Sequence, residues 1–428
     1  MTINIPDSSL PRVVIIGAGF GGLLLAKKLA KSGGFQVVLL DKNNYHQFQP
    51  LFYQVAMAGL EPSSIVFPLR KMFRNYPDVY IRVTEVKEVT CGTNEVHTDL
   101  GSLHYDYLVI ATGVDTNYFG NMEVAAHAIP MKSVSEALYL RNRILNDYEQ
   151  AITTGDYETR QGLVDIVIVG GGPTGVEVAG ALAEMRQFIL PKDYRELNVK
   201  EVDILLIQSS PQLLKGMSEQ ASEAALRYLE ELGVNVLLNN RVTGFDGKWV
   251  DTKDGTRIRA NKVIWAAGIT GNLPKGMPET AVGPGMRLKV NRFGEVDACS
   301  DIYAIGDIAY METPAYPEGH PQVAQVAIQQ ARNLAHNILQ KQKGKTLRPF
   351  EYRDKGSMAT IGRHRAVVDL PKTHLHGAFA WLIWLLVHLF SLIGAKNKLF
   401  VFLNWVWNYF TYDQSLRLII RPRVVRDE

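Results

Sequence analysis

Two copies of one short pattern constrain this 428-residue chain more than any other feature. Residues 12–22 and 165–175 each place a short apolar run before a turn of the form Gly-x-Gly-x-x-Gly, and helix-forming residues follow. The first turn starts at Gly17 and the second at Gly170. A repeated strand, glycine turn and helix predict an α/β protein with two Rossmann-like dinucleotide-binding domains.

The context of the first turn favours a nucleotide site over a turn that is merely tight. Gly17 permits the sharp bend, Gly19 lets the backbone approach a pyrophosphate, and Gly22 allows the helix to pack closely. The helix N-terminus then meets the phosphate charge, and Asp41, which ends the next strand, can accept hydrogen bonds from a ribose. Two such turns in one chain indicate two dinucleotides held face to face, most naturally FAD and a nicotinamide nucleotide.

The second turn departs from the usual fingerprint at one place. Its glycines, Gly170, Gly172 and Gly175, are complete, but the following strand ends at Gln208. An acid at that position favours NADH by binding the 2′-hydroxyl of the ribose. A neutral amide neither anchors the diol as strongly nor repels a 2′-phosphate, so the choice between NADH and NADPH stays open.

Composition excludes several other classes of protein. Charged residues make up 21% of the chain and the net charge is +3, so we expect no nucleic-acid partner. The two cysteines, Cys91 and Cys299, supply neither a disulfide framework nor a thiolate metal cluster, and we expect them to be inert packing residues. No metal is needed for the chemistry that follows. The N-terminus lacks the features of a signal peptide, which predicts a cytoplasmic chain.

Taken together, six segments resemble the type II NADH dehydrogenases, single-subunit flavoenzymes that reduce quinone. The segments are Gly17–Gly22, Asn44–Ala56, Ala111–Gly113, Gly170–Glu177, Gly306–Asp307 and Ala324–Gln329. The resemblance implies a glutathione-reductase-like fold and hydride transfer from NAD(P)H to FAD. It also implies two-electron reduction of a membrane quinone, either menaquinone or ubiquinone, without proton pumping.

The same resemblance assigns the cofactor contacts residue by residue. The residues that it assigns to FAD are Gly17, Ala18, Gly19, Phe20, Gly21, Gly22, Asp41, Lys42, Val83, Ala111, Thr112, Gly113, Gly306, Asp307, Ala324 and Gln325. The residues that it assigns to the nicotinamide nucleotide are Gly170, Gly172, Gly175, Glu177, Gln208 and Gly268. Among the FAD residues, Asp307 is expected to bind the ribityl chain.

Three polar residues have a more specific expected role and a simpler alternative. Glu177 is expected to orient the nicotinamide and to assist proton delivery, although a carboxylate in the first turn of a helix is also stabilised by the helix dipole alone. Gln325 and Gln329 share one helix face and are expected to bind the quinone. On spacing alone, such glutamines are more often solvated.

The C-terminal part carries an apolar stretch, residues 377–394, with no formal charge. As a helix it spans about 27 Å, short of the roughly 30 Å core of a bilayer. One stripe of it holds Trp381, Trp384, His388 and Ser391, and the next apolar run, 399–410, has a stripe of Asn404, Asn408, Thr411 and Ser415. These stripes predict two helices lying in the membrane interface, with a buried helix pair or a dimer contact as alternatives.

The predicted organisation has three parts. They are an FAD-binding domain over 1–120 and 285–340, an NAD(P)H-binding domain over 121–284, and a membrane-anchoring region over 341–428. The resemblance implies a homodimer attached to the lipid bilayer on the cytoplasmic face of a bacterial membrane. Rival readings are a soluble flavoprotein reductase that serves a protein partner and a redox-sensing, partner-binding flavoprotein that turns over NADH only slowly. A sulfide:quinone oxidoreductase is disfavoured by the sparse cysteines.

Overall fold

The computed structural model describes residues 2–412 and 416–420 and divides into two compact units. Unit 1 comprises Met1–Gln47, Val66–Asp115 and Ile269–Asp354, and unit 2 comprises Phe48–Ile65, Thr116–Gly268 and Lys355–Glu428. The α/β class predicted from the glycine turns is confirmed. By contacts, residues 48–65 and most of the predicted membrane-anchoring region group with the NAD(P)H-binding part.

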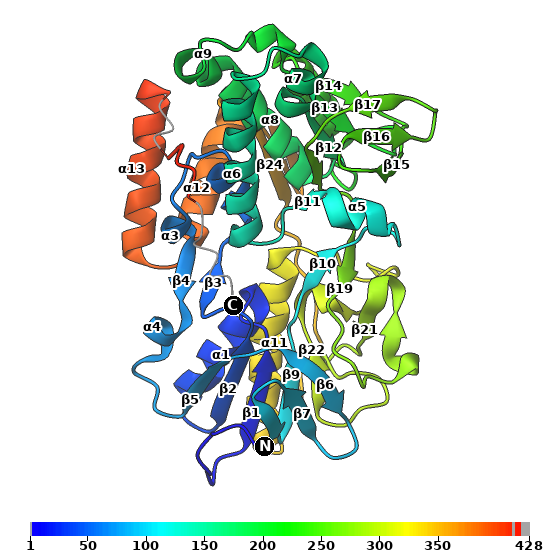
Figure 1. Ribbon diagram of the computed structural model, residues 1–428. Coiled ribbons are helices and arrows are strands. Elements are labelled where there is room, and N and C mark those ends of the chain that lie inside the picture. Colours follow the sequence, from blue (N-terminus) through cyan, green and yellow to red (C-terminus); the bar gives the residue numbers. More distant parts are fainter. Residues whose placement is uncertain (1, 413–415, 421–428) are drawn as a thin grey trace, which may run out of the picture. The chain divides into compact units, whose positions relative to one another are not determined.

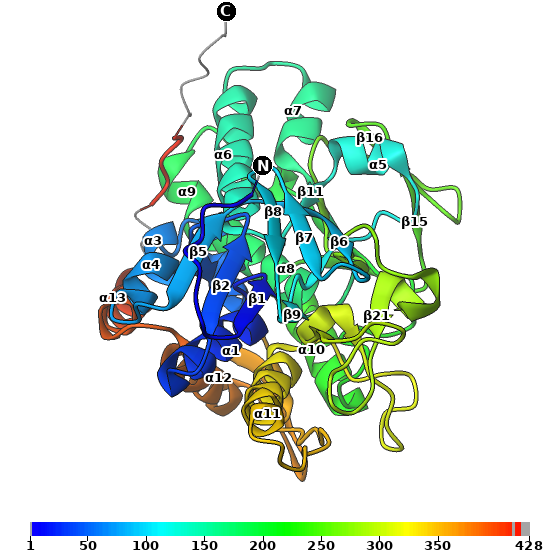
Figure 2. The ribbon, with the colours of Figure 1, turned by 90° about the horizontal axis from the view of Figure 1, so that it is seen from below.

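The core of unit 1 is a parallel sheet of five strands (Figure 1). Its order is β22 (Ile302–Ala304), β9 (Tyr107–Ile110), β1 (Arg12–Ile16), β2 (Gln36–Asp41) and β5 (Val79–Val83). In Figure 2, β1, β2 and β5 lie side by side. Val13, Val14 and Ile15 are fully buried, as expected of a parallel strand that is covered on both faces.

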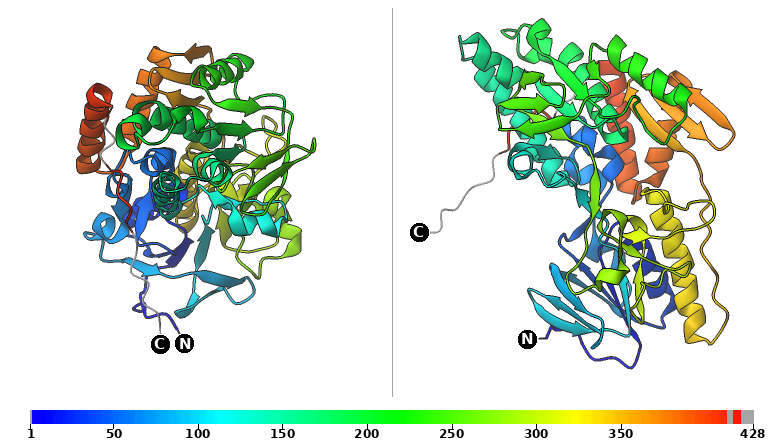
Figure 3. Two further views of the ribbon diagram at one scale, coloured as in Figure 1. Left: turned by 45° about the horizontal axis from the view of Figure 1, so that its top comes forward. Right: turned by 90° about the vertical axis from the view of Figure 1, so that its right-hand side faces the viewer.

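Helices and several small sheets complete unit 1. Helix α1 (Phe20–Ser32) packs against α11 (Ala324–Gln342), drawn in yellow in Figure 3. The remaining elements of unit 1 are β3 (Tyr45–Gln47), β4 (Val66–Pro68), α4 (Leu69–Phe73), β6 (Val86–Thr90), β7 (Glu95–Thr98), β8 (Gly101–His104), β19 (Ile269–Gly271), β20 (Val282–Gly283), β21 (Arg287–Lys289), η5 (Gly306–Ile308) and β23 (Ala309–Tyr310).

The two cysteines meet in unit 1 although they are 208 positions apart. Cys91 follows β6, Cys299 precedes β22, and their Sγ atoms lie 2.8 Å apart as free thiols. Both side chains pack against the core of the unit. Burial raises the pKa of the Cys299 thiol to about 12, so this thiol stays protonated at neutral pH.

Unit 2 repeats the plan of unit 1 around a second parallel sheet of five strands. Its order is β11 (Ile129–Pro130), β18 (Val263–Trp265), β12 (Ile166–Val169), β13 (Ile204–Ile207) and β14 (Asn235–Leu237). Other elements of this unit are α5 (Met122–His127), α6 (Val134–Ala151), α7 (Tyr157–Val164), α8 (Pro173–Phe188), α9 (Leu190–Asp193), α10 (Glu219–Glu231), β15 (Val242–Phe245), β16 (Trp249–Thr252) and β17 (Arg257–Arg259).

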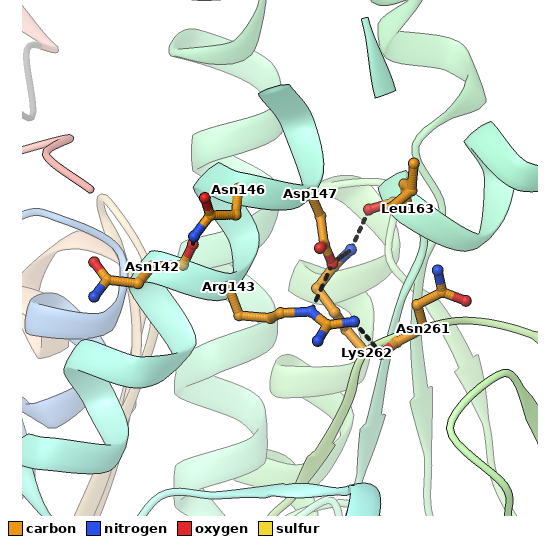
Figure 4. A network of polar contacts seen from close by, with 7 residues as sticks. All are labelled: Asn142, Arg143, Asn146, Asp147, Leu163, Asn261 and Lys262. Atoms are coloured by element: carbon orange, nitrogen blue, oxygen red, sulfur yellow. Dashed lines mark hydrogen bonds and ion pairs between the residues drawn. The ribbon is translucent and has the colours of Figure 1, made fainter. Parts of the chain in front are cut away.

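A buried ion pair ties α6 to the chain just before β18 (Figure 4). Lys262 is 0% exposed, and its Nζ donates to Asp147 Oδ2 at 2.9 Å and to the carbonyl of Leu163. Arg143 Nε donates to the same carboxylate at 3.1 Å. Removing one partner of such a buried pair leaves a charge without compensation, at a cost of about 3–5 kcal/mol.

The C-terminal part of unit 2 is a small antiparallel sheet followed by two helices. The sheet consists of β24 (Ser357–Gly362), β25 (Arg365–Leu370) and β26 (Thr373–His376), and the helices are α12 (Ala378–Ser391) and α13 (Ala395–Thr411). The short helices α2 (Phe52–Ala56) and α3 (Pro62–Ile65) also belong to this unit. No helix of the described residues is long and apolar enough to cross a membrane.

Candidate functional site

The first glycine turn forms a cradle that leaves no room for a side chain at its first and last glycines and is open at the middle one. Gly17 has a φ of +99°, and a Cβ built there would lie 2.4 Å from the carbonyl oxygen of Ala111. A Cβ on Gly22 would lie 1.9 Å from the carbonyl oxygen of Gly17. A Cβ on Gly19 would meet nothing within 4 Å. The middle glycine therefore faces open space, where a pyrophosphate can approach the backbone.

Asp41 closes this turn from the end of β2. Its Oδ2 accepts the backbone amide of Ala18 at 2.6 Å and its Oδ1 accepts that of Asn43 at 2.7 Å. Burial raises the pKa of the Asp41 carboxyl, and the two amides oppose that rise. Val83 lies opposite Asp41 on β5, and Lys42 pairs with Glu85 at 2.8 Å on the surface. The ribose contact of Asp41 stays a prediction.

Two buried polar atoms beside the cradle have no partner among the described residues. They are Nε2 of His46 and Oγ1 of Thr112. His46 Nδ1 lies 2.9 Å from the carbonyl oxygen of Ala18, and the ring meets Phe20 edge-on at 5.3 Å. Buried polar atoms are normally satisfied, so these two fit a ligand rich in phosphate and hydroxyl groups such as FAD.

The segment Gly306–Asp307 is held by side chains that the sequence did not single out. The Gly306 amide donates to Gln330 Oε1 at 2.7 Å. The carbonyl of Asp307 accepts from Gln322 Nε2 and from Arg287 Nε, each at 3.1 Å. Gln330 directly follows Gln329, so its position next to the Ala-Gln-x-Ala-x-Gln segment was the available signal. Nothing in the sequence pointed to Arg287.

The two glutamines expected to bind quinone lie on α11 in different surroundings. Gln325 occupies the first turn of the helix, and its Oε1 is buried. Gln329 pairs its amide with the backbone of Arg353, donating at 2.9 Å and accepting at 3.1 Å. Gln329 therefore holds the backbone at Arg353, close to the end of unit 1. A contact between Gln329 and quinone would require these two hydrogen bonds to break.

The second glycine turn repeats the geometry of the first. A Cβ on Gly170 would lie 2.7 Å from the carbonyl oxygen of Ala266, and one on Gly175 would lie 1.8 Å from that of Gly170. Gly172 again meets nothing within 4 Å. Gly268 has a φ of +79°, a backbone conformation that favours glycine. This cradle suits a second dinucleotide.

Gln208 closes the second turn as Asp41 closes the first. Its Oε1 accepts the backbone amide of Gly171 at 2.9 Å. Its Nε2 donates to Ser210 Oγ at 2.6 Å. The side chain thus tightens the turn, and its expected contact with a ribose stays a prediction.

Glu177 does not lie in the first turn of its helix. Helix α8 begins at Pro173 and has no acidic residue in its first turn, so the helix dipole does not account for this carboxyl and that alternative is wrong. The side chain keeps only partial exposure, and the protein around it raises the pKa of the carboxyl to about 8. The backbone amide of Thr360 and the indole of Trp384 oppose this rise.

The C-terminal segment supplies these neighbours because β24 lies directly on α8. A Cβ on Gly180 would lie 2.0 Å from the carbonyl oxygen of Ile361, so the absent side chain allows the contact. The backbone amide of Arg363 donates to Glu184, which lies one helical turn beyond Gly180 on α8. Neither Thr360 nor Trp384 was predicted beside Glu177, because their approach depends on tertiary packing.

Trp384 of α12 belongs to a cluster of aromatic side chains next to this carboxyl. Trp384 is buried, stacks on His388 with ring centres 4.0 Å apart, and meets Tyr53 at 6.2 Å. Burial lowers the pKa of His388 to about 4. Of the four residues in the predicted stripe of α12, Trp384 is buried and Trp381 and His388 are partly buried, whereas Ser391 is exposed.

The outward faces of α12 and α13 are apolar. Their exposed residues are Phe379, Leu382, Leu386, Val387, Phe390, Leu399, Phe400, Phe402, Leu403, Val406, Trp407 and Phe410. The polar residues Asn404, Asn408 and Thr411 lie on the more buried side of α13, as predicted, while Ser415 lies outside the described residues. This set of exposed residues is called the apolar face below. Exposed apolar residues gathered on neighbouring helices in this way mark surfaces that bind proteins, ligands or membranes.

Two family models match this chain. The model for pyridine nucleotide-disulphide oxidoreductases matches residues 11–331, and that for the NDH2 C-terminal domain matches residues 355–412. A type II NADH:quinone oxidoreductase of Mycobacterium tuberculosis is 36% identical, over 92% of this chain and 87% of that protein. An internal alternative NAD(P)H-ubiquinone oxidoreductase of Arabidopsis thaliana is 28% identical, over 94% and 85%.

Solved structures share the fold. NDH2 of Plasmodium falciparum, solved in complex with NADH, superposes with a TM-score of 0.87 at 22% identity and covers 96% of this chain and 100% of its own. The sulfide:quinone oxidoreductase of Aquifex aeolicus gives a TM-score of 0.71 at 18% identity, over 94% and 95%. At such identities the likeness concerns the fold alone.

Proposed function

We propose, on the premise that this chain belongs to the type II NADH:quinone oxidoreductases, that it oxidises NADH and reduces a membrane quinone. The observation that carries the proposal is the pair of cradles, each closed at its first and third glycines and open at the middle one. Bound FAD would accept a hydride from NADH and pass two electrons to quinone, which takes up two protons. The reaction moves no charge across the membrane.

The first cradle would hold FAD. Gly19 and the start of α1 face the pyrophosphate, the buried His46 and Thr112 atoms offer polar contacts, and Asp307 follows a turn fixed by three side chains. We assign the nicotinamide nucleotide to the second cradle. With Gln208 there, NADPH competes with NADH to a degree that the assay below measures.

Glu177 would orient the nicotinamide while keeping its own proton. With a pKa of about 8, its carboxyl is largely neutral at pH 7 and can donate a hydrogen bond as well as accept one. Gln325 is the proposed quinone contact on α11. Gln329 joins it only if the Arg353 backbone pair opens, which makes its quinone role the weaker of the two assignments.

The apolar face would rest on the lipid bilayer, on the cytoplasmic side of the membrane. Phe390 is 71% exposed and Phe410 is 77% exposed, while Lys396 and Lys398 at the start of α13 suit the headgroup level. The variant Phe390→Asp/Phe410→Asp should lose flotation with anionic lipid vesicles and keep NADH oxidation with ferricyanide. Unchanged flotation would contradict lipid docking, and light scattering in detergent tests the expected homodimer.

One assay tests the function as a whole. Membrane-bound and detergent-extracted protein should oxidise NADH, and NADPH more slowly, in a quinone-dependent manner. A rival soluble reductase would prefer a protein acceptor and ignore quinone. Deleting residues 377–428 does not separate the two, because Trp384 is buried and its loss would damage unit 2. Colourless protein that cannot be reconstituted with FAD would end the proposal.

A further inference from the structure

A chain of three side chains in unit 2 leads from α13 to Tyr53. Trp405 Nε1 donates to Gln54 Oε1 at 2.7 Å, and Gln54 Nε2 donates to the Tyr53 hydroxyl oxygen at 2.7 Å. Tyr53 and Gln54 belong to the segment Asn44–Ala56, which carried part of the family resemblance, and neither of the two has been given a role in the cradles. The contacts raise the question of what the tyrosine hydroxyl does.

The chemistry of the three groups fixes the direction of every hydrogen bond. An indole N–H only donates, so Gln54 must turn its carbonyl oxygen toward Trp405. Its NH₂ group then faces Tyr53, and because that group cannot accept, the tyrosine oxygen is the acceptor. The hydroxyl hydrogen of Tyr53 therefore points away from Gln54.

No acceptor for this hydrogen is present among the described residues. Tyr53 is 9% exposed, so water does not readily replace a missing partner. Burial and the nearby charge of Glu177 both raise the pKa of the hydroxyl, which keeps it protonated and able to donate. A buried donor without a partner costs free energy unless a ligand accepts from it.

The surroundings of Tyr53 suit a flat, uncharged ligand with a carbonyl group. Trp384 meets the tyrosine ring at 6.2 Å and stacks on His388, which in turn meets Phe48 at 6.3 Å. Aromatic walls of this kind favour planar rings. A quinone is planar and carries carbonyl oxygens that accept hydrogen bonds.

We propose that Tyr53 donates its hydroxyl hydrogen to a carbonyl oxygen of the quinone, and that Gln54 and Trp405 hold the hydroxyl in this direction. The inference rests on the proposed quinone reduction and names a substrate contact for it. Tyr53 is the residue that touches substrate, while Gln54 and Trp405 are positioning residues. Trp405 belongs to the helix whose other side contributes to the apolar face, so lipid docking and substrate contact share α13.

The test compares two acceptors in detergent solution, a short-chain ubiquinone and ferricyanide, with NADH as donor. Tyr53→Phe keeps the ring and removes the donor, so the ratio of quinone to ferricyanide kcat should fall about tenfold. Trp405→Phe should lower the same ratio about threefold, since Gln54 loses the group that orients it. In the Tyr53→Phe background, Trp405→Phe should cause no further loss.

Matched controls remove the same groups elsewhere in unit 2. Tyr139→Phe acts on an exposed tyrosine of α6, and Trp249→Phe acts on β16. Both should keep the wild-type ratio, and FAD content reports folding of every variant.

A wild-type ratio in Tyr53→Phe would overturn the substrate contact. A loss from Trp405→Phe that persists in full without the Tyr53 hydroxyl would overturn the positioning chain. If the wild-type protein reduces ferricyanide but no quinone, the proposed function itself is wrong. That result comes from the wild-type protein alone and is therefore distinct from a failure of the Tyr53 contact.

Discussion

The two glycine turns share one backbone geometry and differ in the side chain that closes them. Asp41 accepts the amide of Ala18 in the first turn, and Gln208 accepts the amide of Gly171 in the second. Each turn therefore needs one acceptor oxygen at this place, which an acid or an amide supplies equally well. The charge of the side chain is not needed to close the turn, so it can serve to discriminate between NADH and NADPH.

A second difference lies two residues beyond the third glycine. The first copy has Leu24 there, and the second has Glu177. Both helices form, so the fold tolerates either side chain at this position. The carboxyl in the second copy is thus free to serve chemistry, and its high pKa follows from burial rather than from the turn.

The largest expected effects come from adding a methyl group to the third glycine of either turn. Gly22→Ala should lose FAD on purification, because the new Cβ meets a backbone oxygen that cannot retreat. Gly175→Ala should keep FAD but raise the KM for NADH by about 10- to 100-fold. The visible absorbance of bound flavin and steady-state kinetics measure the two outcomes.

The controls are Gly92→Ala in unit 1 and Gly155→Ala in unit 2, since neither new Cβ meets an atom within 4 Å. Both should behave like wild type. Loss of FAD from Gly175→Ala would show that the two cradles do not act independently.

Glu177→Gln should abolish a pH dependence that Leu24, at the matching position of the first copy, does not have. With a folded pKa of about 8 and an ordinary value of 4.5, the folded protein binds the extra proton between these limits. Stability from this group is therefore complete below pH 4.5 and falls as pH rises to 8, by at most about 1.4 kcal/mol per pH unit. Urea unfolding of the FAD-loaded protein from pH 5.5 to 8.5 measures the slope.

Glu223→Gln, on the exposed side of α10, should leave that slope unchanged. A Glu177→Gln variant with the wild-type slope would mean that its carboxyl is not the group that titrates.

Gln208→Glu should sharpen the difference in charge between the turns. The new side chain keeps an acceptor for the Gly171 amide, so the turn persists, while its charge repels a 2′-phosphate. We expect the ratio of kcat/KM for NADPH to that for NADH to fall about tenfold. Gln220→Glu, which adds the same charge on exposed α10, is the control, and an unchanged ratio in Gln208→Glu would count against a ribose contact.

The smallest effect should come from Lys42→Ala. Lys42 and Glu85 form an exposed pair, which contributes little to stability. If Lys42 also contacts the adenosine ribose, as the family resemblance implies, FAD affinity should weaken about two- to threefold with little change in Tm. Fluorescence titration of the apoprotein with FAD measures this, and Glu85→Gln separates loss of the ion pair from loss of the cation.

The sequence predicted those features that depend on neighbouring residues. Apolar runs such as Arg12–Ile16 and Ile166–Val169 become central strands because both faces of their sheets are covered, and the glycines that follow have only one workable geometry. The inward stripe of α13 was also predictable, since a helix repeats its faces at regular spacing.

Other features depend on distant segments and left no local signal. Thr360 and Trp384 reach Glu177 only because β24 crosses Gly180. The contact between Cys91 and Cys299 likewise arises from tertiary packing, as does the hydrogen bond from Arg287 to the carbonyl oxygen of Asp307. The start of α8 was the one local feature misjudged, and that error placed Glu177 too close to the helix end.

The order of strands in unit 1 has a consequence for biosynthesis. Strand β22, which covers the β9 edge of the sheet, begins at Ile302, whereas β9 ends at Ile110. At about 5–20 residues per second, a ribosome takes roughly 10–40 s to make the chain between them. During that interval the nascent β9 edge lacks its final neighbour, so chaperone binding to ribosome-bound chains should peak before residue 302 emerges.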